Sequence, residues 1–432
     1  MAAGDKVFIA DKKTLDEVHA NTVGILAAVG DGAHKHLKRY GIKIAKGNSG
    51  KDARVEYILD AVGMTPAKMD YDLGVFNYGS WENVGFVSPE MNYPCMLKAD
   101  GTEDYKLDPN DYSLKEGSGL PSDVANIDYD GNAMAAFVGG WLCQFETKTD
   151  EYIIWCAEQF DETYKAYHRM TPDGEIRPGF YRRIYTPTEA LKKAKSISGQ
   201  QPMYSKNATQ ERELIKANGE AYEHTSWSEY NYITCLLKIM GKTEDCQTAF
   251  GNGNMNGYVE DPLKFYGVLK TGTLDNKGQF FGSRTNNEQV KVFHTEAMWG
   301  DQYERLIGLV CDHGKLKVSP YGPYNFNGTG YHVVTDYIEN GVVKPGDGYK
   351  GGYTKDTIVN EYGRFTKNWG GSTSTYLCDY HAINPDILSV ALVGGYASYG
   401  AACGPGCVNL SYTVSGAYWS IAPGLSYKMP VA

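Results

Sequence analysis

The stretch LVGGYASYG, residues Leu392–Gly400, determines how the C-terminal part of the chain is interpreted. Two hydrophobic residues lead into a pair of glycines, and glycine is the residue that best tolerates the left-handed backbone of a tight turn. Tyrosine and serine follow directly, and such residues on an anchored loop are typical of surfaces that contact a partner. The stretch therefore predicts a loop on a packed frame that displays its side chains outward.

The same kind of side chain recurs as far as Trp419. Eight positions are predicted to be exposed and to bind a receptor: Tyr396, Ser398, Tyr399, Asn409, Ser411, Tyr412, Ser415 and Tyr418. Their composition is that of an antibody paratope. The frame beneath them is predicted to consist of Leu392, Val393, Leu410, Ile421 and Leu425. Interior packing of individual tyrosines is the alternative interpretation.

Composition excludes several classes of protein. The chain has 432 residues, of which 42% are hydrophobic and 22% charged, so global disorder is excluded. A net charge of −10 argues against wrapping nucleic acid, which requires a clustered positive surface. The best apolar run, Leu388–Tyr396, is interrupted by serine and glycine, so we expect no membrane insertion.

The nine cysteines are scattered and include no CxxC pair, which favours a chain that folds in a reducing cytosol. Cys403 and Cys407 flank a Gly-Pro-Gly sequence. Two thiols at this spacing either ligate a soft metal or form a redox pair, or they are unpaired small residues. No nucleotide-binding, metalloprotease or hydrolase motif is present. Asp301 and Glu304 are candidates for general acid–base catalysis on a glycan, and structural hydrogen bonding is the alternative. We therefore predict no catalytic residue, no metal site and no cofactor.

The chain is predicted to have three segments. Residues 1–50 form an attachment and oligomerisation segment, residues 51–150 the N-terminal part of the body, and residues 151–432 the domain with the display face. In the first segment, Thr14 and Glu17 have capping-box spacing, and an apolar stripe follows at Leu15, Val18, Thr22, Ile25 and Val29. The stripe predicts a helix that associates with other copies of the chain or, alternatively, an amphipathic helix that packs on its own domain. Helical spacing recurs at Asp52–Val62, Thr188–Lys195, Ala208–Ala217 and Trp227–Met240.

The run Leu392–Gly400, followed by Gly404 and closed by Trp419–Ile421 and Leu425–Tyr427, resembles the C-terminal element of the C-type-lectin-like fold. It is most similar to the version shared by the formylglycine-generating-enzyme family and the variable tip proteins of phage diversity-generating retroelements. Further segments, in order along residues 50–432, resemble structural proteins of phages of gut Firmicutes: Arg54–Pro66, Tyr78–Trp81, Pro94–Leu97, Leu107–Tyr112, Gly131–Met134, Ser196–Pro202, Val290–Phe293, Glu296, Trp299–Gly300, Arg305–Gly308 and Gly370–Asp379.

The chain departs from the family pattern in three places. Ile421–Leu425 replaces the usual Ile-Gly-x-Arg-Leu closing segment. The Glu-Pro-Asn and Trp-Asn-Asp calcium motifs of sugar-binding C-type lectins are missing, so we do not predict a calcium-dependent lectin. Cys403 and Cys407 lie beyond the offsets that the oxidase branch of the fold uses.

The resemblance implies an α+β fold, with a short N-terminal oligomerisation helix followed by a loop-rich C-type-lectin-like body of short antiparallel strands. It also implies a non-enzymatic bacteriophage virion fibre protein or adhesin. Such a protein would form a homotrimer that contacts other virion proteins and binds a host-cell surface glycan or protein through its C-terminal face. It would fold in the host cytoplasm and then reside in the virion. The alternatives are a decoration or collar protein without a receptor role, and a copper oxidase using Cys403 and Cys407.

Overall fold

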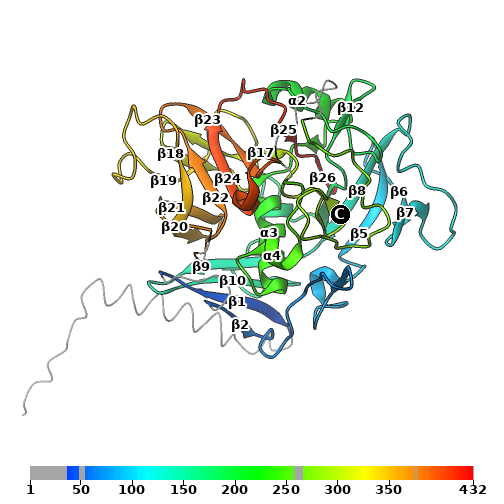
Figure 1. Cartoon of the computed structure of the whole chain (residues 1–432), viewed down its shortest axis with the longest axis horizontal. Helices are drawn as coiled ribbons and strands as arrows, with labels where there is room; N and C mark the ends of the chain where they lie inside the picture. The colour runs from blue at the N-terminus through cyan, green and yellow to red at the C-terminus, as the bar shows by residue number, and fades with distance from the viewer. Residues whose placement is uncertain are drawn as a thin grey trace, which may run out of the picture.

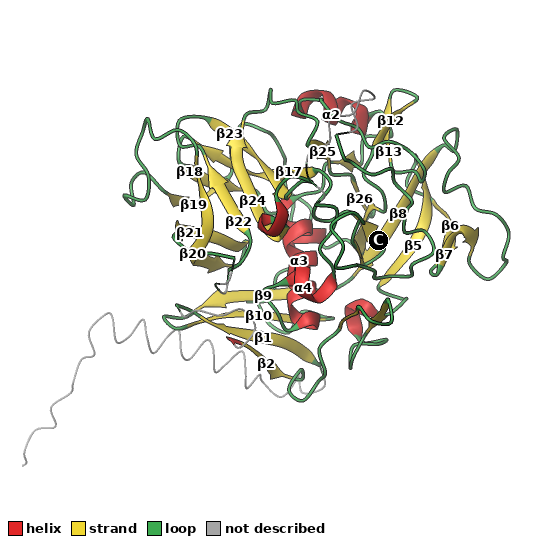
Figure 2. Cartoon of the chain, viewed as in Figure 1, coloured by secondary structure: helices red, strands yellow, loops and turns green. Residues whose placement is uncertain are grey.

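The computed structural model describes residues 37–47, 54–255, 257, 266–373, 375 and 377–431. Among the described residues, strands account for about 38% and helices for about 10%, so the fold is mostly β (Figure 2). The predicted α+β class with a C-type-lectin-like body is therefore wrong. Short aromatic and β-branched segments separated by turns pair into sheets throughout the described part, in preference to helices. The predicted N-terminal helix and its apolar stripe lie outside the described residues.

A four-stranded antiparallel sheet has the order β2-β1-β10-β9. Its strands are β1 (Arg39–Ala45), β2 (Val55–Leu59), β9 (Trp141–Glu146) and β10 (Asp150–Cys156). The helix predicted over Asp52–Val62 is wrong, because Val55–Leu59 pairs with β1 as a strand. Gly63, in the turn after β2, has a φ of +85°, which glycine adopts without strain.

A seven-stranded antiparallel sheet has the order β14-β26-β11-β8-β5-β6-β7. Its strands are β5 (Asn92–Lys98), β6 (Glu103–Asp108), β7 (Asp111–Lys115), β8 (Gly131–Val138), β11 (Gly179–Arg183), β14 (Tyr222–Glu223) and β26 (Ser426–Lys428). The last strand of the chain thus pairs next to strands from its first half. The predicted boundary between residues 150 and 151 falls inside β10, and the division into three segments stays a prediction.

The C-terminal sheet has the order β19-β18-β17-β23-β24-β22-β20-β21, and β25 also pairs with β17. Its strands are β17 (Tyr303–Asp312), β18 (Lys315–Val318), β19 (His332–Asp336), β20 (Lys350–Asn360), β21 (Gly363–Trp369), β22 (Tyr380–Ile383), β23 (Leu388–Gly394), β24 (Gly404–Tyr412) and β25 (Ile421–Pro423). The β22–β24 and β17–β25 pairs are parallel, and the other pairs are antiparallel. This sheet carries the predicted display loop.

Three short hairpins complete the strands: β3 (Lys68–Asp70) with β4 (Val75–Asn77), β12 (Thr188–Ala190) with β13 (Lys193–Lys195), and β15 (Lys291–Val292) with β16 (Thr295–Glu296). The second hairpin replaces the helix predicted over Thr188–Lys195. Leu191 and Lys192 at its turn have φ values of +54° and +57°. Two successive left-handed residues form the tight turn that joins paired strands, and a right-handed helix cannot contain them.

The described helices are α2 (Ala208–Lys216), α3 (Trp227–Gly241), α4 (Cys246–Phe250), and the 3₁₀ turns η3 (Gly85–Val87), η4 (Tyr167–Arg169) and η5 (Gly400–Ala402). Helices α2 and α3 confirm the predictions for Ala208–Ala217 and Trp227–Met240. Ser226 and Glu229 cap α3 reciprocally: the Ser226 side chain accepts from the Glu229 N–H, and the Glu229 carboxylate accepts from the Ser226 N–H.

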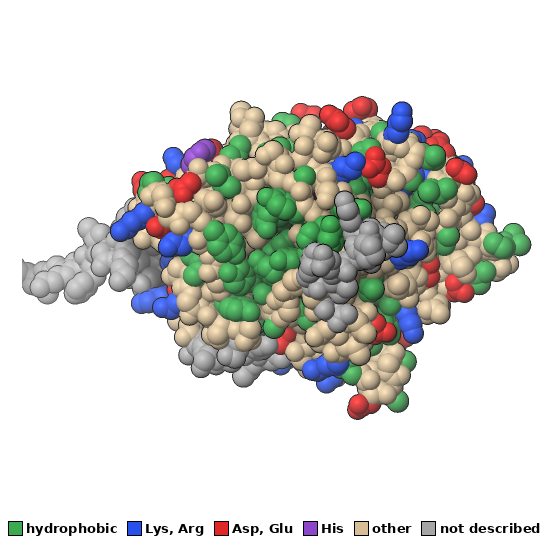
Figure 3. Space-filling model, turned by 45° about the horizontal axis from the view of Figure 1, so that its top comes forward, with side chains coloured by type: hydrophobic (Ala, Val, Ile, Leu, Met, Phe, Trp, Pro, Cys, Tyr) green, Lys and Arg blue, Asp and Glu red, His purple; other side chains and the backbone are tan. Residues whose placement is uncertain are grey.

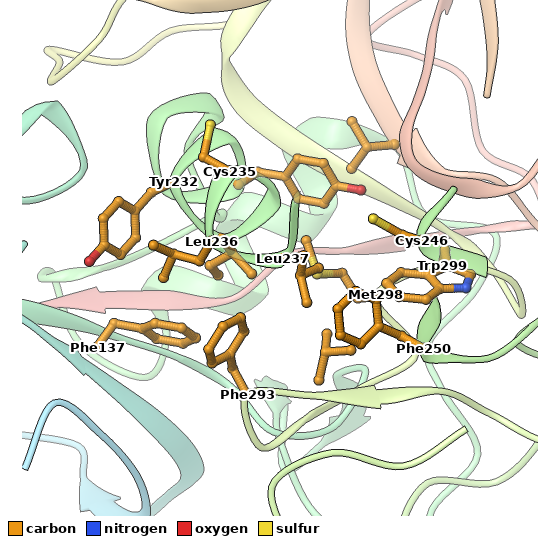
Figure 4. Close-up of a cluster of buried hydrophobic side chains, with 14 of the residues drawn as sticks. Phe137, Tyr232, Cys235, Leu236, Leu237, Cys246, Phe250, Phe293, Met298 and Trp299 are labelled. Atoms are coloured by element: carbon orange, nitrogen blue, oxygen red, sulfur yellow. The ribbon is translucent and has the colours of Figure 1, made fainter. Parts of the chain in front are cut away.

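Helix α3 lies at the centre of the molecule, where it contacts β1, β10, β17 and β21 (Figure 1). All of its residues except Gly241 are buried, which explains why it is apolar on more than one face. Figure 4 shows side chains of α3, including Leu236 and Leu237, beside Phe137 of β8 and Phe293. The C-terminal sheet therefore packs against a buried helix and its close-packed neighbours, which fix the positions of its strands.

Candidate functional site

The loop after β23 is fixed by its two glycines. Gly394 and Gly395 have φ values of +85° and +79°. A Cβ on Gly395 would lie 2.5 Å from Sγ of Cys403, and a Cβ on Gly394 would lie 2.6 Å from the Met298 carbonyl oxygen. The left-handed backbone and the lack of room for a Cβ therefore both require glycine at these two positions, as the sequence predicts.

Backbone hydrogen bonds hold the rest of the loop. The Ala397 N–H donates to the Asp301 carbonyl at 3.1 Å, and the Tyr399 N–H donates to the Tyr396 carbonyl at 2.8 Å. The five predicted frame residues Leu392, Val393, Leu410, Ile421 and Leu425 are fully buried. Leu392 and Ile421 pack with Tyr303, whereas Leu425 packs in a separate cluster at the seven-stranded sheet. The prediction of a packed frame is confirmed.

Aromatic rings from separate strands meet on the outer side of this frame. The rings of Tyr396 and Tyr399 have centroids 4.7 Å apart, and both pack on buried Tyr303 at 5.2 and 5.4 Å. The row continues from Tyr399 to Tyr380 at 5.6 Å and from Tyr396 to Trp419 at 5.5 Å. We call the cluster of Tyr303, Tyr380, Tyr396, Tyr399 and Trp419 the aromatic face.

A second pair of rings lies next to the aromatic face. Tyr412, at the end of β24, and Tyr418 have ring centroids 5.1 Å apart in an edge-to-face contact. Tyr418 is 48% exposed, which is unusual for a large aromatic side chain. In Figure 3, hydrophobic side chains gather over the region of β23, β24 and β25, and most Lys, Arg, Asp and Glu side chains in that view lie nearer its edge.

The structure brings most of the eight predicted residues to one surface. Ser398, Ser415 and Tyr418 are exposed, and Tyr396, Tyr399, Ser411 and Tyr412 are partly exposed. Asn409 is only 2% exposed, so its predicted exposure is wrong. Its amide donates to the Tyr303 hydroxyl at 3.2 Å and its side-chain oxygen accepts from Ser411, because its side chain points to the inner end of β17. Receptor binding by these residues stays a prediction.

Three tyrosines of this surface, Tyr396, Tyr399 and Tyr412, are electrically neutral at neutral pH. Burial raises the pKa of Tyr396 and Tyr412 above the ordinary value, and neighbouring Cys403 and tyrosine side chains add to the rise. Burial raises the pKa of Tyr399 to about 12. At neutral pH these phenols are therefore protonated and able to donate hydrogen bonds.

The two C-terminal cysteines are part of the frame. Cys403 and Cys407 are fully buried and not disulfide-bonded, and the Cys403 thiol contacts the Tyr396 carbonyl oxygen at 3.4 Å. Burial raises the pKa of both thiols, whereas metal ligation and redox chemistry require the thiolate. Their geometry favours the packing interpretation over the oxidase alternative. Within the described ranges, no group of three or more His, Cys, Asp and Glu side chains is arranged to hold a metal ion.

The two candidate acid–base carboxylates have structural partners. Glu304 is buried and bound by the guanidinium groups of Arg182 and Arg183 at 2.5 and 2.8 Å. Asp301 is buried and accepts from the side-chain amides of Asn254 and Gln289. Neither carboxylate is exposed to a ligand. The geometry therefore supports structural hydrogen bonding by Asp301 and Glu304 and not acid–base catalysis.

Asp379 connects the aromatic face to the interior. It precedes β22, and its carboxylate accepts the Gly406 N–H of β24 at 2.7 Å. Burial raises the pKa of Asp379 to about 7. This side chain therefore supports the start of the strand that carries Cys407 and Asn409.

An internal cavity of about 70 Å³ lies between α3 and the inner side of the C-terminal sheet. Lys238, Glu244 and Arg364 line one part of it, and Glu244 is ion-paired with both basic side chains. His381 lines another part, and burial lowers its pKa to about 3. Because these charges pair with one another, the cavity is a weaker candidate for recognition than the aromatic face.

Sequence analysis missed Tyr303, Tyr380 and Trp419 as members of the site. Tyr303 and Tyr380 begin strands far from Tyr396 in sequence, and no local spacing connects them. Trp419 belongs to the closing segment and directly follows Tyr418, one of the predicted residues, so its position next to the predicted surface indicates a role there. Topology brings the rings together, because β17 and β22 flank β23 and β24.

The chain matches no protein-family model, and no curated protein sequence matches it. Among the described residues, the helices are too short or too polar to cross a membrane.

Proposed function

We propose that the chain is a bacteriophage virion fibre protein that adheres to a host-cell surface receptor through the aromatic face and the residues next to it. The observation that carries the proposal is a row of partly exposed aromatic rings, packed on buried Tyr303 and on a frame fixed by Gly394 and Gly395: Tyr380, Tyr396, Tyr399 and Trp419. The tyrosine and serine residues that follow the glycine pair in Leu392–Gly400 support it from the sequence.

Several features of the surface support adhesion. Tyrosine and tryptophan supply large contact areas at a low cost in conformational entropy. Exposed Ser398 and Ser415 add hydroxyl groups that adapt to different partners. The frame residues are fully buried, so exposed positions can change without unfolding the sheet. In a trimer, three such faces engage together, and linked weak sites give strong overall attachment.

The test is binding of the purified, fluorescently labelled chain to the bacterium on which the particles grow. Ser398→Arg places a bulky charge between Tyr396 and Tyr399 without removing a buried side chain. We expect at least a tenfold loss of cell binding. Ser118→Arg, at an exposed serine in the turn after β7, is the matched control and should bind like the parent chain. Equal binding by all three proteins, or no binding by the parent chain, contradicts the proposal.

A further inference from the structure

Among the residues that the structure describes, no charged side chain acts on the hydroxyl of Tyr396 or Tyr412. The pKa values of these two phenols are raised by burial and by neighbouring Cys and Tyr side chains, and no Lys, Arg, Asp or Glu contributes. Neither hydroxyl donates to a protein group within the described residues, so both are available to a ligand. A ligand with a net charge would lose its hydration here without gaining an opposite charge.

A surface hollow lies directly beyond the Tyr412–Tyr418 pair. It has a volume of about 340 Å³ and is lined by Asn207, Thr209, Leu388, Thr413, Val414 and Ser415. All six side chains are uncharged, and four of them carry hydroxyl or amide groups. The Thr413 and Ser415 hydroxyls lie 2.9 Å apart at its rim. Thr413 follows Tyr412 in the chain, so the hollow and the tyrosine pair are adjacent.

Together, the aromatic face and the hollow have two complementary properties. The rings offer apolar surface, because Tyr396, Tyr399 and Tyr412 are partly exposed and Tyr418 is exposed. The phenol, hydroxyl and amide groups offer hydrogen-bond donors and acceptors without charge. A ligand that matches both properties has an apolar side, many hydroxyl groups and no ionised group.

From this chemistry we infer that the receptor is a neutral oligosaccharide. One sugar unit stacks its C–H face on the rings of Tyr396 or Tyr399. A neighbouring unit places its hydroxyls toward Thr413 and Ser415 in the hollow. The inference rests on the proposed function and specifies the ligand class of the same surface. Acidic saccharides and charged protein epitopes are disfavoured, because no charged side chain among the described residues shifts the pKa of Tyr396 or Tyr412 or lines the hollow.

The experiment compares cell binding of the full chain after two treatments of the cells. Periodate cleaves the vicinal diols of sugars, and a protease removes surface proteins. We expect periodate to reduce binding at least tenfold and protease to leave it unchanged. Binding that survives periodate and is lost after protease overturns the saccharide inference but leaves the adhesion proposal intact. Failure of the chain to bind untreated cells overturns the proposed function itself, so the two failures are distinguishable.

A printed array of bacterial polysaccharides gives an independent readout without cells. The parent chain should bind neutral polysaccharides and not their sulfated or uronic-acid counterparts. Ser415→Arg, which inserts a charged side chain at the hollow, should lose at least tenfold of this signal, and Ser118→Arg should retain it. Binding confined to acidic polysaccharides, or equal binding by Ser415→Arg, contradicts the inference.

Discussion

At the scale of single residues, Gly395 is the position on which the loop depends most. We expect Gly395→Ala to reduce the free energy of unfolding by about 1–2 kcal/mol for the left-handed backbone alone, with a further loss from the contact with Cys403. Gly330 is the control, since its φ is +78° and no atom lies within 4 Å of a Cβ placed there. Urea unfolding of both variants measures the difference, and equal losses would contradict the steric account.

Asp379 gives a residue-scale prediction about pH. Its pKa is raised by burial to about 7, above the value of about 3.9 in an unfolded chain. The folded state therefore holds this proton more tightly, and the protein loses stability as pH rises from about 4 to 7. Asp379→Asn removes that loss while keeping an oxygen for the Gly406 N–H. We expect the variant to gain stability relative to the parent chain at pH 8 and not at pH 4, as measured by thermal unfolding. A gain that is equal at both pH values would contradict the assignment.

At the scale of elements, a buried ion pair joins α2 to β17. The Arg305 Nε donates to Glu211 Oε2 at 2.7 Å, and both side chains are fully buried. We expect Arg305→Met to cost about 3–5 kcal/mol in the free energy of unfolding, because Glu211 loses this partner while remaining buried. Lys43→Met breaks the surface pair with Glu56, which is 64% exposed, and should cost less than about 1 kcal/mol. Equal urea midpoints for the two variants would contradict this account.

Some helices and strands are predicted correctly from the sequence, and others are not. The spacing of Tyr230, Ile233 and Leu237 identifies α3 correctly. Its 15 residues pair with no strand, so the helical pattern of the sequence decides the structure there. Val55, Ile58 and Val62 have the same spacing, but Val55–Leu59 pairs with β1, since strand pairing outweighs a short helical pattern. Asn409 looks exposed beside tyrosines and serines, yet the position of Tyr303 on the neighbouring β17 turns it inward. Contacts between residues far apart in the sequence, such as Asn409 and Tyr303, cannot be predicted from the spacing of neighbouring residues.

At the scale of the whole molecule, the proposal predicts a trimer. Sedimentation of the full chain should give three copies, and a chain beginning at residue 37 should sediment as one copy, because the apolar stripe lies before that residue. The shortened chain should also bind cells at least a hundredfold more weakly, since linked sites reinforce one another. Unchanged circular dichroism would establish that the shortened chain folds. A monomeric full chain would contradict the prediction.

The central claim is that the aromatic face points away from the particle toward the host cell. Cryo-electron microscopy of the intact virion, at a resolution that places side chains, tests it most directly. We predict that Tyr396, Tyr412 and Tyr418 lie on the outer surface of the fibre with solvent in front of them. A map in which these rings pack against a neighbouring subunit, or face the particle, would contradict the claim.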